Sequence, residues 1–235
     1  MADSVFLPDV RLTSVLMHDN AELQTAREQL VSFCGRMIAD GLAVGAAGNI
    51  SMRVGDLVAI TPSGVSYAEL VPADICITTL SGEEVDAPET PSSELAMHLA
   101  VYAATSAAAV VHTHSAEVIA VSATSAELPA VHYAINGLGG PVRVAAYTRF
   151  GSAGLAEAAV AALDGRSAAI LQNHGAICYG RTLREAYDRA VLLEWLARVY
   201  RLARAQGAPR ILSQAELDEV AAESRRRNYG ERRRR

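Results

Sequence analysis

The stretch AAVVHTHSAEVIAVSAT, residues 108–124, indicates the fold class, because two kinds of periodicity meet within it. Its first half is an apolar run that predicts a buried strand over 108–113, ending in polar residues. Its second half, from Ser115 to Thr124, has the apolar spacing of a helix. A short buried strand that leads directly into a helix is typical of layered α/β proteins, so we expect a sheet covered by helices.

Strands and helices also alternate on both sides of this stretch. The other predicted strands cover 49–54, 57–61, 75–80, 131–136, 142–146, 168–171 and 176–179. The other predicted helices cover 20–40, 94–104, 152–163, 183–205 and 214–224, with Ser92 or Ser93 as the N-cap of the second. Gly55-Asp56 is typical of a tight hairpin, so the sheet should be mixed and largely antiparallel. We expect one three-layer α/β/α domain over 1–235, with a lead segment at 1–19 and an arginine-rich tail at 225–235.

Composition limits the classes of function. No apolar run in the 235 residues reaches the roughly 18 residues that a membrane span needs. The N-terminus lacks the pattern of a signal peptide, so we expect a soluble, cytoplasmic protein. The net charge is −5, and we interpret the arginines of the tail as a solvated end rather than a nucleic-acid site. Cys34, Cys76 and Cys178 lie in apolar runs and are expected to be reduced core residues.

All 21 positively charged side chains are arginine, because the sequence contains no lysine. An enzyme of this sequence therefore cannot form a Schiff base between a lysine amine and a carbonyl substrate. Chemistry next to a carbonyl would need another electron sink, such as a metal ion. Histidines and carboxylates that could bind such an ion are the first candidates for a functional site.

Three histidines have the pattern of metal ligands. His112 and His114 are two residues apart at the end of a predicted strand, so both side chains should point to one face. His174 belongs to Gln172-Asn173-His174-Gly175, a polar cluster between two apolar strands. Three neutral imidazoles leave an open position on a zinc-like ion for substrate. The alternative for His174 is a role in capping a turn through hydrogen bonds.

Three further side chains have both a catalytic and a structural interpretation. Glu94 begins the helix that follows Pro91-Ser92-Ser93. It is either a capping-box residue or a fourth metal ligand that becomes a general base when substrate displaces it. His98 follows on the same helix face and is expected to pack rather than to bind a metal. His132 and Tyr133 are expected on opposite faces of a strand. Tyr133 is either a proton donor or a tyrosine at the domain edge.

Anion recognition without lysine needs backbone N–H groups, hydroxyls, amides or arginine. Small residues in three loops offer such donors: Gly48-Asn49-Ile50-Ser51, Thr61-Pro62-Ser63-Gly64 and Ser92-Ser93. Glycine permits close approach of the backbone, and serines before a helix place hydroxyls and N–H groups where an anion is favoured. Taken singly, each loop is more often an ordinary turn.

Together these motifs resemble the class II aldolase and adducin-head family in their order and spacing, from about Glu22 to Tyr229. The motifs are GNIS (48–51), TPSG (61–64), SSE (92–94), HTH (112–114), HY (132–133) and QNHG (172–175). The resemblance implies zinc as cofactor, with Mn²⁺ or Co²⁺ as alternatives, and a C4-type homotetramer with active sites at subunit interfaces. The metal ligands it implies are His112, His114, His174 and Glu94. The phosphate-binding residues it implies are Gly48, Asn49, Ser63, Gly64, Ser92 and Ser93.

The resemblance also implies catalytic roles. Glu94 would leave the metal and act as acid and base. Tyr133 would come from a neighbouring subunit and protonate an aldehyde oxygen, and Tyr229 would help to cover the site. After Tyr229 the sequence departs from the family, because Gly230–Arg235 is rich in arginine where the family has a more acidic tail.

The reaction that the resemblance implies is that of a class II, zinc-dependent aldolase. It would reversibly cleave L-fuculose 1-phosphate, or a similar ketose 1-phosphate, to dihydroxyacetone phosphate and L-lactaldehyde or another short aldehyde. Alternative activities are those of an L-ribulose-5-phosphate 4-epimerase, a 5-deoxypentulose-1-phosphate aldolase and a methylthioribulose-1-phosphate dehydratase. Epimerases of the family typically carry aspartate where Glu94 stands. An adducin-like binding module is the alternative outside the enzymes, and the complete set of candidate ligands argues against it.

Overall fold

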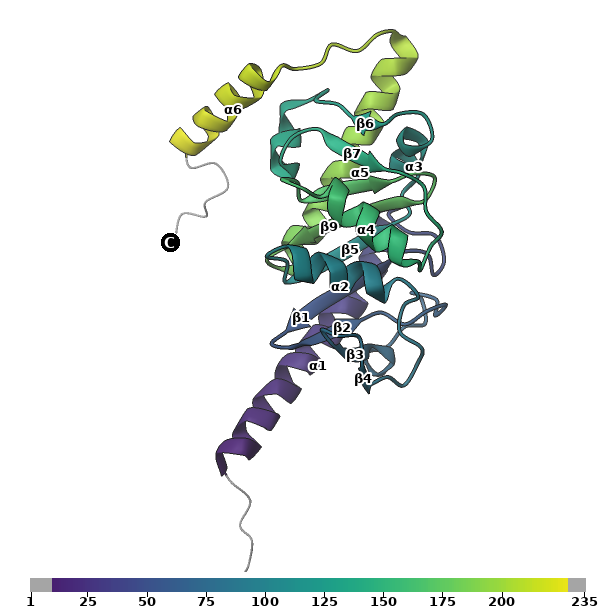
Figure 1. The fold of residues 1–235 in the computed structure, drawn as a ribbon, viewed down its shortest axis with the longest axis vertical. Coiled ribbons are helices and arrows are strands. Elements are labelled where there is room, and N and C mark those ends of the chain that lie inside the picture. The colour runs from purple at the N-terminus through teal and green to yellow at the C-terminus, as the bar shows by residue number, and fades with distance from the viewer. Residues whose placement is uncertain (1–9, 228–235) are drawn as a thin grey trace, which may run out of the picture.

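The computed structural model describes residues 10–227, and a nine-stranded sheet forms its centre (Figure 1). The strands are β1 (Asn49–Val54), β2 (Leu57–Ile60), β3 (Cys76–Thr79), β4 (Glu84–Asp86), β5 (Ala109–Thr113), β6 (Glu127–Leu128), β7 (Val142–Ala145), β8 (Ala168–Leu171) and β9 (Gly175–Gly180). Their order across the sheet is β4-β3-β2-β1-β5-β9-β8-β7-β6. All neighbouring strands are antiparallel except β7 and β8. The expected α/β fold with a mixed, largely antiparallel sheet is confirmed.

Helices cover both faces of this sheet. They are α1 (Val10–Ala39), α2 (Leu95–Ala104), α3 (Ala116–Ser122), α4 (Ala153–Ala162), α5 (Leu183–Gln206) and α6 (Gln214–Arg226), with 3-10 helices η1 (Pro72–Asp74) and η2 (Tyr133–Leu138). Side chains of β5 alternate between two cores: Val111 packs with residues of α1 and α5, and Val110 packs with residues of α2 and α4. The sheet is thus the middle of three layers. In Figure 1, α6 extends away from this body, and its Leu217 lies against η2.

The strand predicted over 131–136 is wrong. Pairing with β7 ends at Leu128, and Pro129, the next residue, has no N–H for a sheet hydrogen bond. The side chain of His132 then accepts a hydrogen bond from the backbone N–H of Ala134, and the chain turns into η2. The apolar alternation that suggested a strand instead anchors Ile135 and Leu138 of η2 in the core.

Two other elements differ from the sequence-based expectations. Helix α1 begins at Val10, ahead of the predicted start at residue 20, and no glycine or proline interrupts the sequence from Val10 to Cys34. Strand β4 was not predicted, because its three residues are exposed at the edge of the sheet and lack an apolar pattern. Neither difference alters the centre of the sheet.

The cysteines agree with the expectation that they are reduced core residues. Cys34, Cys76 and Cys178 are free and buried, and burial raises the pKa of Cys34 and of Cys178 to about 12. Within residues 10–227, every helix is too short or too polar to cross a membrane.

Candidate metal centre and active site

The four predicted metal ligands come together at one end of the central strands. One ligand atom from each of Glu94, His112, His114 and His174 lies within 4.8 Å of the other three. Strand β5 carries His112 and leads into His114, and the turn between β8 and β9 carries His174. Because β5 pairs with β9 from His112↔Ile177 to Thr113↔Ala176, the start of β9 lies beside the end of β5. Residues more than 50 positions apart in the sequence thereby share one site.

Glycine makes the close packing of this centre possible. A Cβ atom on Gly175 would lie 2.0 Å from the carbonyl oxygen of Thr113, so no other residue fits between β9 and β5. Gly48, with φ +80°, would place a Cβ atom 2.6 Å from the carbonyl oxygen of His112. Asn173 has φ 52°, a left-handed conformation that asparagine tolerates better than most residues. This conformation turns the chain so that His174 faces Glu94.

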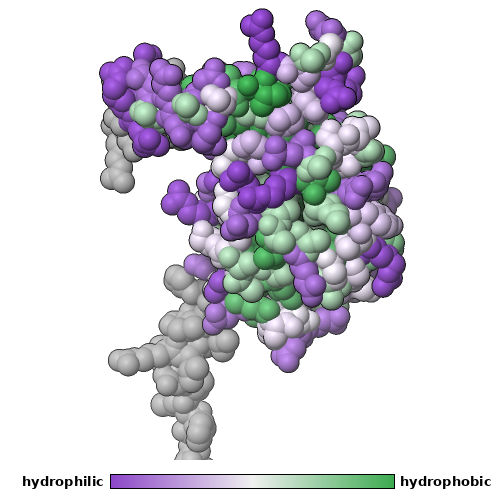
Figure 2. Space-filling view, turned by 45° about the horizontal axis from the view of Figure 1, so that its top comes forward, coloured by the Kyte–Doolittle hydropathy of each residue, from purple (hydrophilic) through white to green (hydrophobic). Residues whose placement is uncertain are grey.

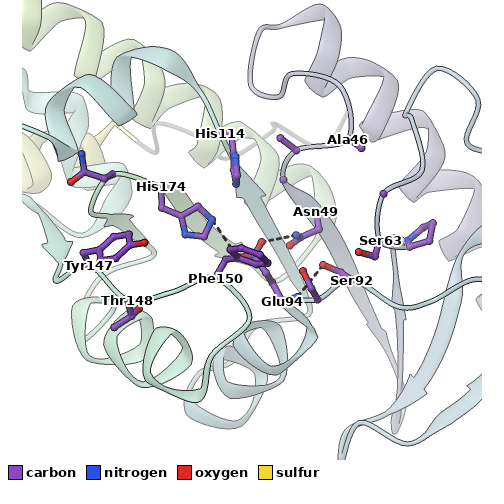
Figure 3. Close-up of a pocket in the computed structure, with 16 residues that line it drawn as sticks. Ala46, Asn49, Ser63, Ser92, Glu94, His114, Tyr147, Thr148, Phe150 and His174 are labelled. Atoms are coloured by element: carbon purple, nitrogen blue, oxygen red, sulfur yellow. Dashed lines mark hydrogen bonds and ion pairs between the residues drawn. The ribbon is translucent and has the colours of Figure 1, made fainter.

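Glu94 is the N-cap residue of α2, so the predicted N-cap at Ser92 or Ser93 is wrong. Ser92 instead accepts a hydrogen bond from the backbone N–H of Glu94, 3.3 Å from its Oγ. The Glu94 side chain makes no capping hydrogen bond and points to the histidines, 3.0 Å from His112 Nε2 and 3.2 Å from His174 Nε2 (Figure 3). The capping-box interpretation therefore does not describe this carboxylate.

The histidines present lone pairs to the centre of this cluster. Nδ1 of His112 is 2.9 Å from the carbonyl oxygen of Ala176, which can only accept, so Nδ1 carries the proton and Nε2 is free to bind a metal. Nε2 of His114 lies 2.9 Å from Nε2 of His112. Burial, together with the neighbouring His112 and His174, lowers the pKa of His114 to about 3, so this ring is neutral.

A divalent cation fits this cluster. Glu94 is only 5% exposed, and burial opposes its ionisation, but His112, His174 and Asn49 outweigh burial and hold its pKa well below the usual range. Its Oε1 is buried and makes no hydrogen bond within residues 10–227. One carboxylate and three imidazoles therefore offer four ligand atoms, all within 4.8 Å of one another, to a single ion. The donor set is that of a site for zinc or a similar ion.

The cluster opens into a cavity of about 300 Å³. All six predicted phosphate-binding residues line its wall: Gly48, Asn49, Ser63, Gly64, Ser92 and Ser93. Glu94, His114 and His174 line it too, whereas His112 is fully buried behind them. Within residues 10–227, no arginine lines the cavity, so its anion donors are backbone N–H groups, hydroxyls and an amide.

Sequence reasoning missed a further wall of the cavity, the loop between β7 and α4. Tyr147, Thr148 and Phe150 lie across from the serines (Figure 3). Two contacts hold this loop: the Tyr147 N–H donates to Gln172 Oε1 at 3.0 Å, and Gly151 would place a Cβ atom 2.9 Å from the carbonyl oxygen of Ser93. Two aromatic residues close together in a short loop were the signal that could have identified it.

The structure does not bring Tyr133, a predicted catalytic residue, to the cavity of its own chain. The Tyr133 side chain is 52% exposed and does not line the cavity of its own chain. Its ring stacks on His132 at 4.3 Å, so the expectation that these residues point to opposite faces is wrong. The second ring neighbour of His132 is the half-exposed Trp195 of α5. Tyr229 lies outside the described residues.

Comparisons with known proteins identify the relatives of this chain. Residues 28–201 match the family model "Class II Aldolase and Adducin N-terminal domain". The chain is 40% identical over 202 residues to the 5-deoxy-D-ribulose 1-phosphate aldolase of Bacillus thuringiensis serovar kurstaki, covering 85% of this chain and 95% of that protein. It is 39% identical over 196 residues to the 5-methylthioribulose-1-phosphate/5-deoxyribulose-1-phosphate aldolase of Rhodospirillum rubrum, covering 83% and 88%. A solved structure of an L-fuculose 1-phosphate aldolase superposes with a TM-score of 0.82 at 32% identity, covering 86% and 96%.

Proposed function

The chain belongs to the class II aldolase and adducin N-terminal domain family, and on that basis we propose that it is a metal-dependent aldolase. Its substrate would be a 5-deoxypentulose 1-phosphate, cleaved to dihydroxyacetone phosphate and a two-carbon aldehyde or its methylthio derivative. The observation that carries this proposal is the convergence of Glu94 and three histidines on a cavity that also holds three loops of neutral anion donors.

The choice of substrate differs from the L-fuculose 1-phosphate expected from the sequence. Two relatives at 40% and 39% identity are named for 5-deoxyribulose 1-phosphate, whereas the L-fuculose phosphate aldolase of Escherichia coli (strain K12) is 37% identical over 174 residues. The 5-deoxypentulose-1-phosphate aldolase activity, an alternative in the sequence analysis, is therefore favoured over cleavage of L-fuculose 1-phosphate.

We assign the metal to Glu94, His112, His114 and His174, with zinc as the ion that suits three imidazoles and a carboxylate. A bound divalent ion would supply a Lewis acid that polarises the ketose carbonyl. The protein's part is orientation: the Ala176 carbonyl fixes the His112 ring, and the αL turn at Asn173 fixes His174. Backbone geometry thus orients two of the proposed ligands, His112 and His174.

Glu94 is the proposed acid and base. In the direction of synthesis its carboxylate takes a proton from the hydroxymethyl carbon of dihydroxyacetone phosphate, and in cleavage it returns that proton. The ionised carboxylate is the form of Glu94 that can accept this proton. Ser92, Ser93, Ser63 and Asn49 would hold the phosphate, with the backbone N–H groups near the start of α2 adding to its stabilisation.

The test is release of dihydroxyacetone phosphate from 5-deoxyribulose 1-phosphate and from L-fuculose 1-phosphate by zinc-loaded protein. L-Ribulose 5-phosphate, whose phosphate would leave with the aldehyde fragment, is assayed separately for epimerisation. Release is followed by NADH oxidation with glycerol-3-phosphate dehydrogenase. We expect kcat/KM for 5-deoxyribulose 1-phosphate to exceed that for L-fuculose 1-phosphate by about 10- to 100-fold, the discrimination that one carbon in an apolar pocket provides. The reverse order would return the assignment to fuculose. Conversion of L-ribulose 5-phosphate without release of fragments would identify an epimerase.

We propose further that the active unit is a homotetramer in which Tyr133, and Tyr229 at the tail, serve the cavity of a neighbouring subunit. Tyr133 is half-exposed and away from its own cavity, and Val191, Trp195 and Leu202 leave apolar surface exposed along α5. Figure 2 shows apolar side chains gathered in patches on the face of the molecule that it presents. The exposed apolar side chains of α5 would be covered by neighbouring subunits in a tetramer. Tyr133 would then reach the aldehyde oxygen in the cavity of an adjacent subunit.

Mixed subunits test this arrangement. Glu94→Gln and Tyr133→Phe chains should each be nearly inactive, but after co-expression about a quarter of the sites in random tetramers would combine a normal Glu94 with a neighbour's normal Tyr133. We therefore expect recovery of about a quarter of wild-type turnover, measured on tetramers isolated by size-exclusion chromatography. Recovery that stays at the level of the single variants would place both residues in one chain, and a monomeric mass would exclude the assembly.

A further inference from the structure

Behind the metal cluster lies a buried row of polar side chains that the proposed mechanism does not use. His98 is at its centre, fully buried, one helical turn after Glu94 on α2. Its Nε2 is 2.6 Å from Asn49 Oδ1, and its Nδ1 is 2.7 Å from Ser51 Oγ. Ser51 Oγ is in turn 2.7 Å from the hydroxyl of Tyr102. At the other end, Asn49 Nδ2 is 2.9 Å from Glu94 Oε2 (Figure 3).

The direction of each hydrogen bond follows from the carboxylate. An ionised Glu94 can only accept, so the amide group of Asn49 presents its NH₂ to Glu94 and its Oδ1 to His98. Oδ1 can only accept, so Nε2 of His98 carries a proton. His98 is completely buried, and burial disfavours the charged imidazolium, so Nδ1 has none. Nδ1 then accepts from Ser51, which accepts from Tyr102. Every donor in the row points towards Glu94.

This row of hydrogen bonds determines which way the side-chain amide of Asn49 is oriented. An amide rotated by half a turn would place its oxygen against the Glu94 carboxylate, and two acceptors at that distance repel each other. The Nε2 proton of His98 prevents this rotation, because it would then face the amide NH₂. Asn49 itself is held beside the metal ligands, since Asn49 of β1 pairs with His112 of β5.

We infer that His98 is a positioning residue, which acts through Asn49 to hold Oε2 of Glu94 in place for the metal. The inference rests on the proposed metal centre but not on the aldolase reaction, because it concerns the geometry of one ligand. His98 itself is not a ligand: it lies outside the group of convergent metal-binding atoms and is shielded from the cavity. Its role is thus more specific than the packing role expected from the sequence.

The test is zinc affinity, measured by competition with a chromogenic chelator on the full-length protein. His98→Leu removes the Nε2 donor and should weaken zinc binding by about 10- to 100-fold, the usual effect of losing a partner of a ligand. His98→Gln can present an amide N–H to Asn49 Oδ1 and should stay within about threefold of wild type. In a Glu94→Ala background the same His98→Leu change should have almost no further effect, because its route to the metal is gone.

Several results would overturn the inference. Unchanged zinc affinity in a folded His98→Leu protein would do so, as would an equal loss with and without Glu94, which indicates general damage to the core. If His98→Leu does not fold, Ser51→Ala tests the same row, because it removes the hydroxyl that donates to Nδ1. It should weaken zinc binding by about threefold or more, since His98 loses the hydrogen bond that orients its ring. An unchanged affinity would again contradict the positioning role of His98. None of these readouts requires turnover, so failure of the proposed reaction would be seen separately.

Discussion

Glu94→Gln is expected to lower aldol cleavage by a factor of about 10²–10⁴, the usual contribution of a general acid or base. Glutamine has nearly the shape of glutamate and keeps an oxygen that can face the histidines, so the fold should persist. It cannot take a proton from the hydroxymethyl carbon, so the loss should fall on kcat more than on KM.

The measurement compares kcat, KM and zinc content of Glu94→Gln with those of wild type and of Glu83→Gln. Glu83 lies exposed in the turn between β3 and β4, so the same chemical change there should leave all three quantities unchanged. A Glu94→Gln enzyme with normal kcat would remove this carboxylate from the mechanism. A large loss of zinc together with kcat would instead assign Glu94 mainly to metal binding.

Removal of the metal should have a comparable or larger effect. Exhaustive treatment with a chelator is expected to lower turnover by at least about 10³-fold, because Lewis-acid stabilisation contributes several kcal/mol and each 1.4 kcal/mol is about tenfold in rate. The absence of lysine removes the alternative route through a Schiff base. His112→Ala should give the same loss together with zinc below one ion per chain, since it deletes a fully buried ligand.

The metals that restore activity to the chelated enzyme distinguish a site with nitrogen ligands from one with oxygen ligands. Zinc, manganese or cobalt should restore chelated wild type, whereas magnesium, which prefers oxygen ligands, should not. Elemental analysis of the purified protein gives the resident metal directly. A protein that purifies without metal and binds zinc no more tightly than His112→Ala would be a scaffold of the adducin type, and the catalytic proposal would fail.

The sequence contained enough information for the fold and for the residues that converge on the cavity. Alternation along β5 predicted that His112 and His114 share a face, because strand geometry alone determines it. The contact between β5 and the His174 turn is a long-range pairing, and only the resemblance to a family connected these segments in advance. The same holds for the six residues of the proposed phosphate loops, which are ordinary turns when taken singly.

What could not be predicted depends on tertiary contacts that leave a weak local signal. The segment 131–136 has the alternation of a strand but becomes η2, because Pro129 ends the sheet pairing and local hydrogen bonds around His132 turn the chain. The aromatic loop with Tyr147 and Phe150 becomes a wall of the cavity only because Gln172 and Ser93 hold it there. For His98, the apolar neighbours on α2 indicated burial correctly but gave no sign of Asn49, which is 49 positions away in the sequence.

The pairing of β5 with β9 has a consequence for the order of events during synthesis of the chain. Glu94, His112 and His114 emerge from the ribosome well before His174, and the sheet has no neighbour for the far side of β5 until β9 has been made. A nascent chain thus offers an incoming ion only part of its ligands, and long-range strand pairing is the slow step in folding of such sheets. The complete set of four ligands is therefore available to an ion only after the centre of the sheet has closed.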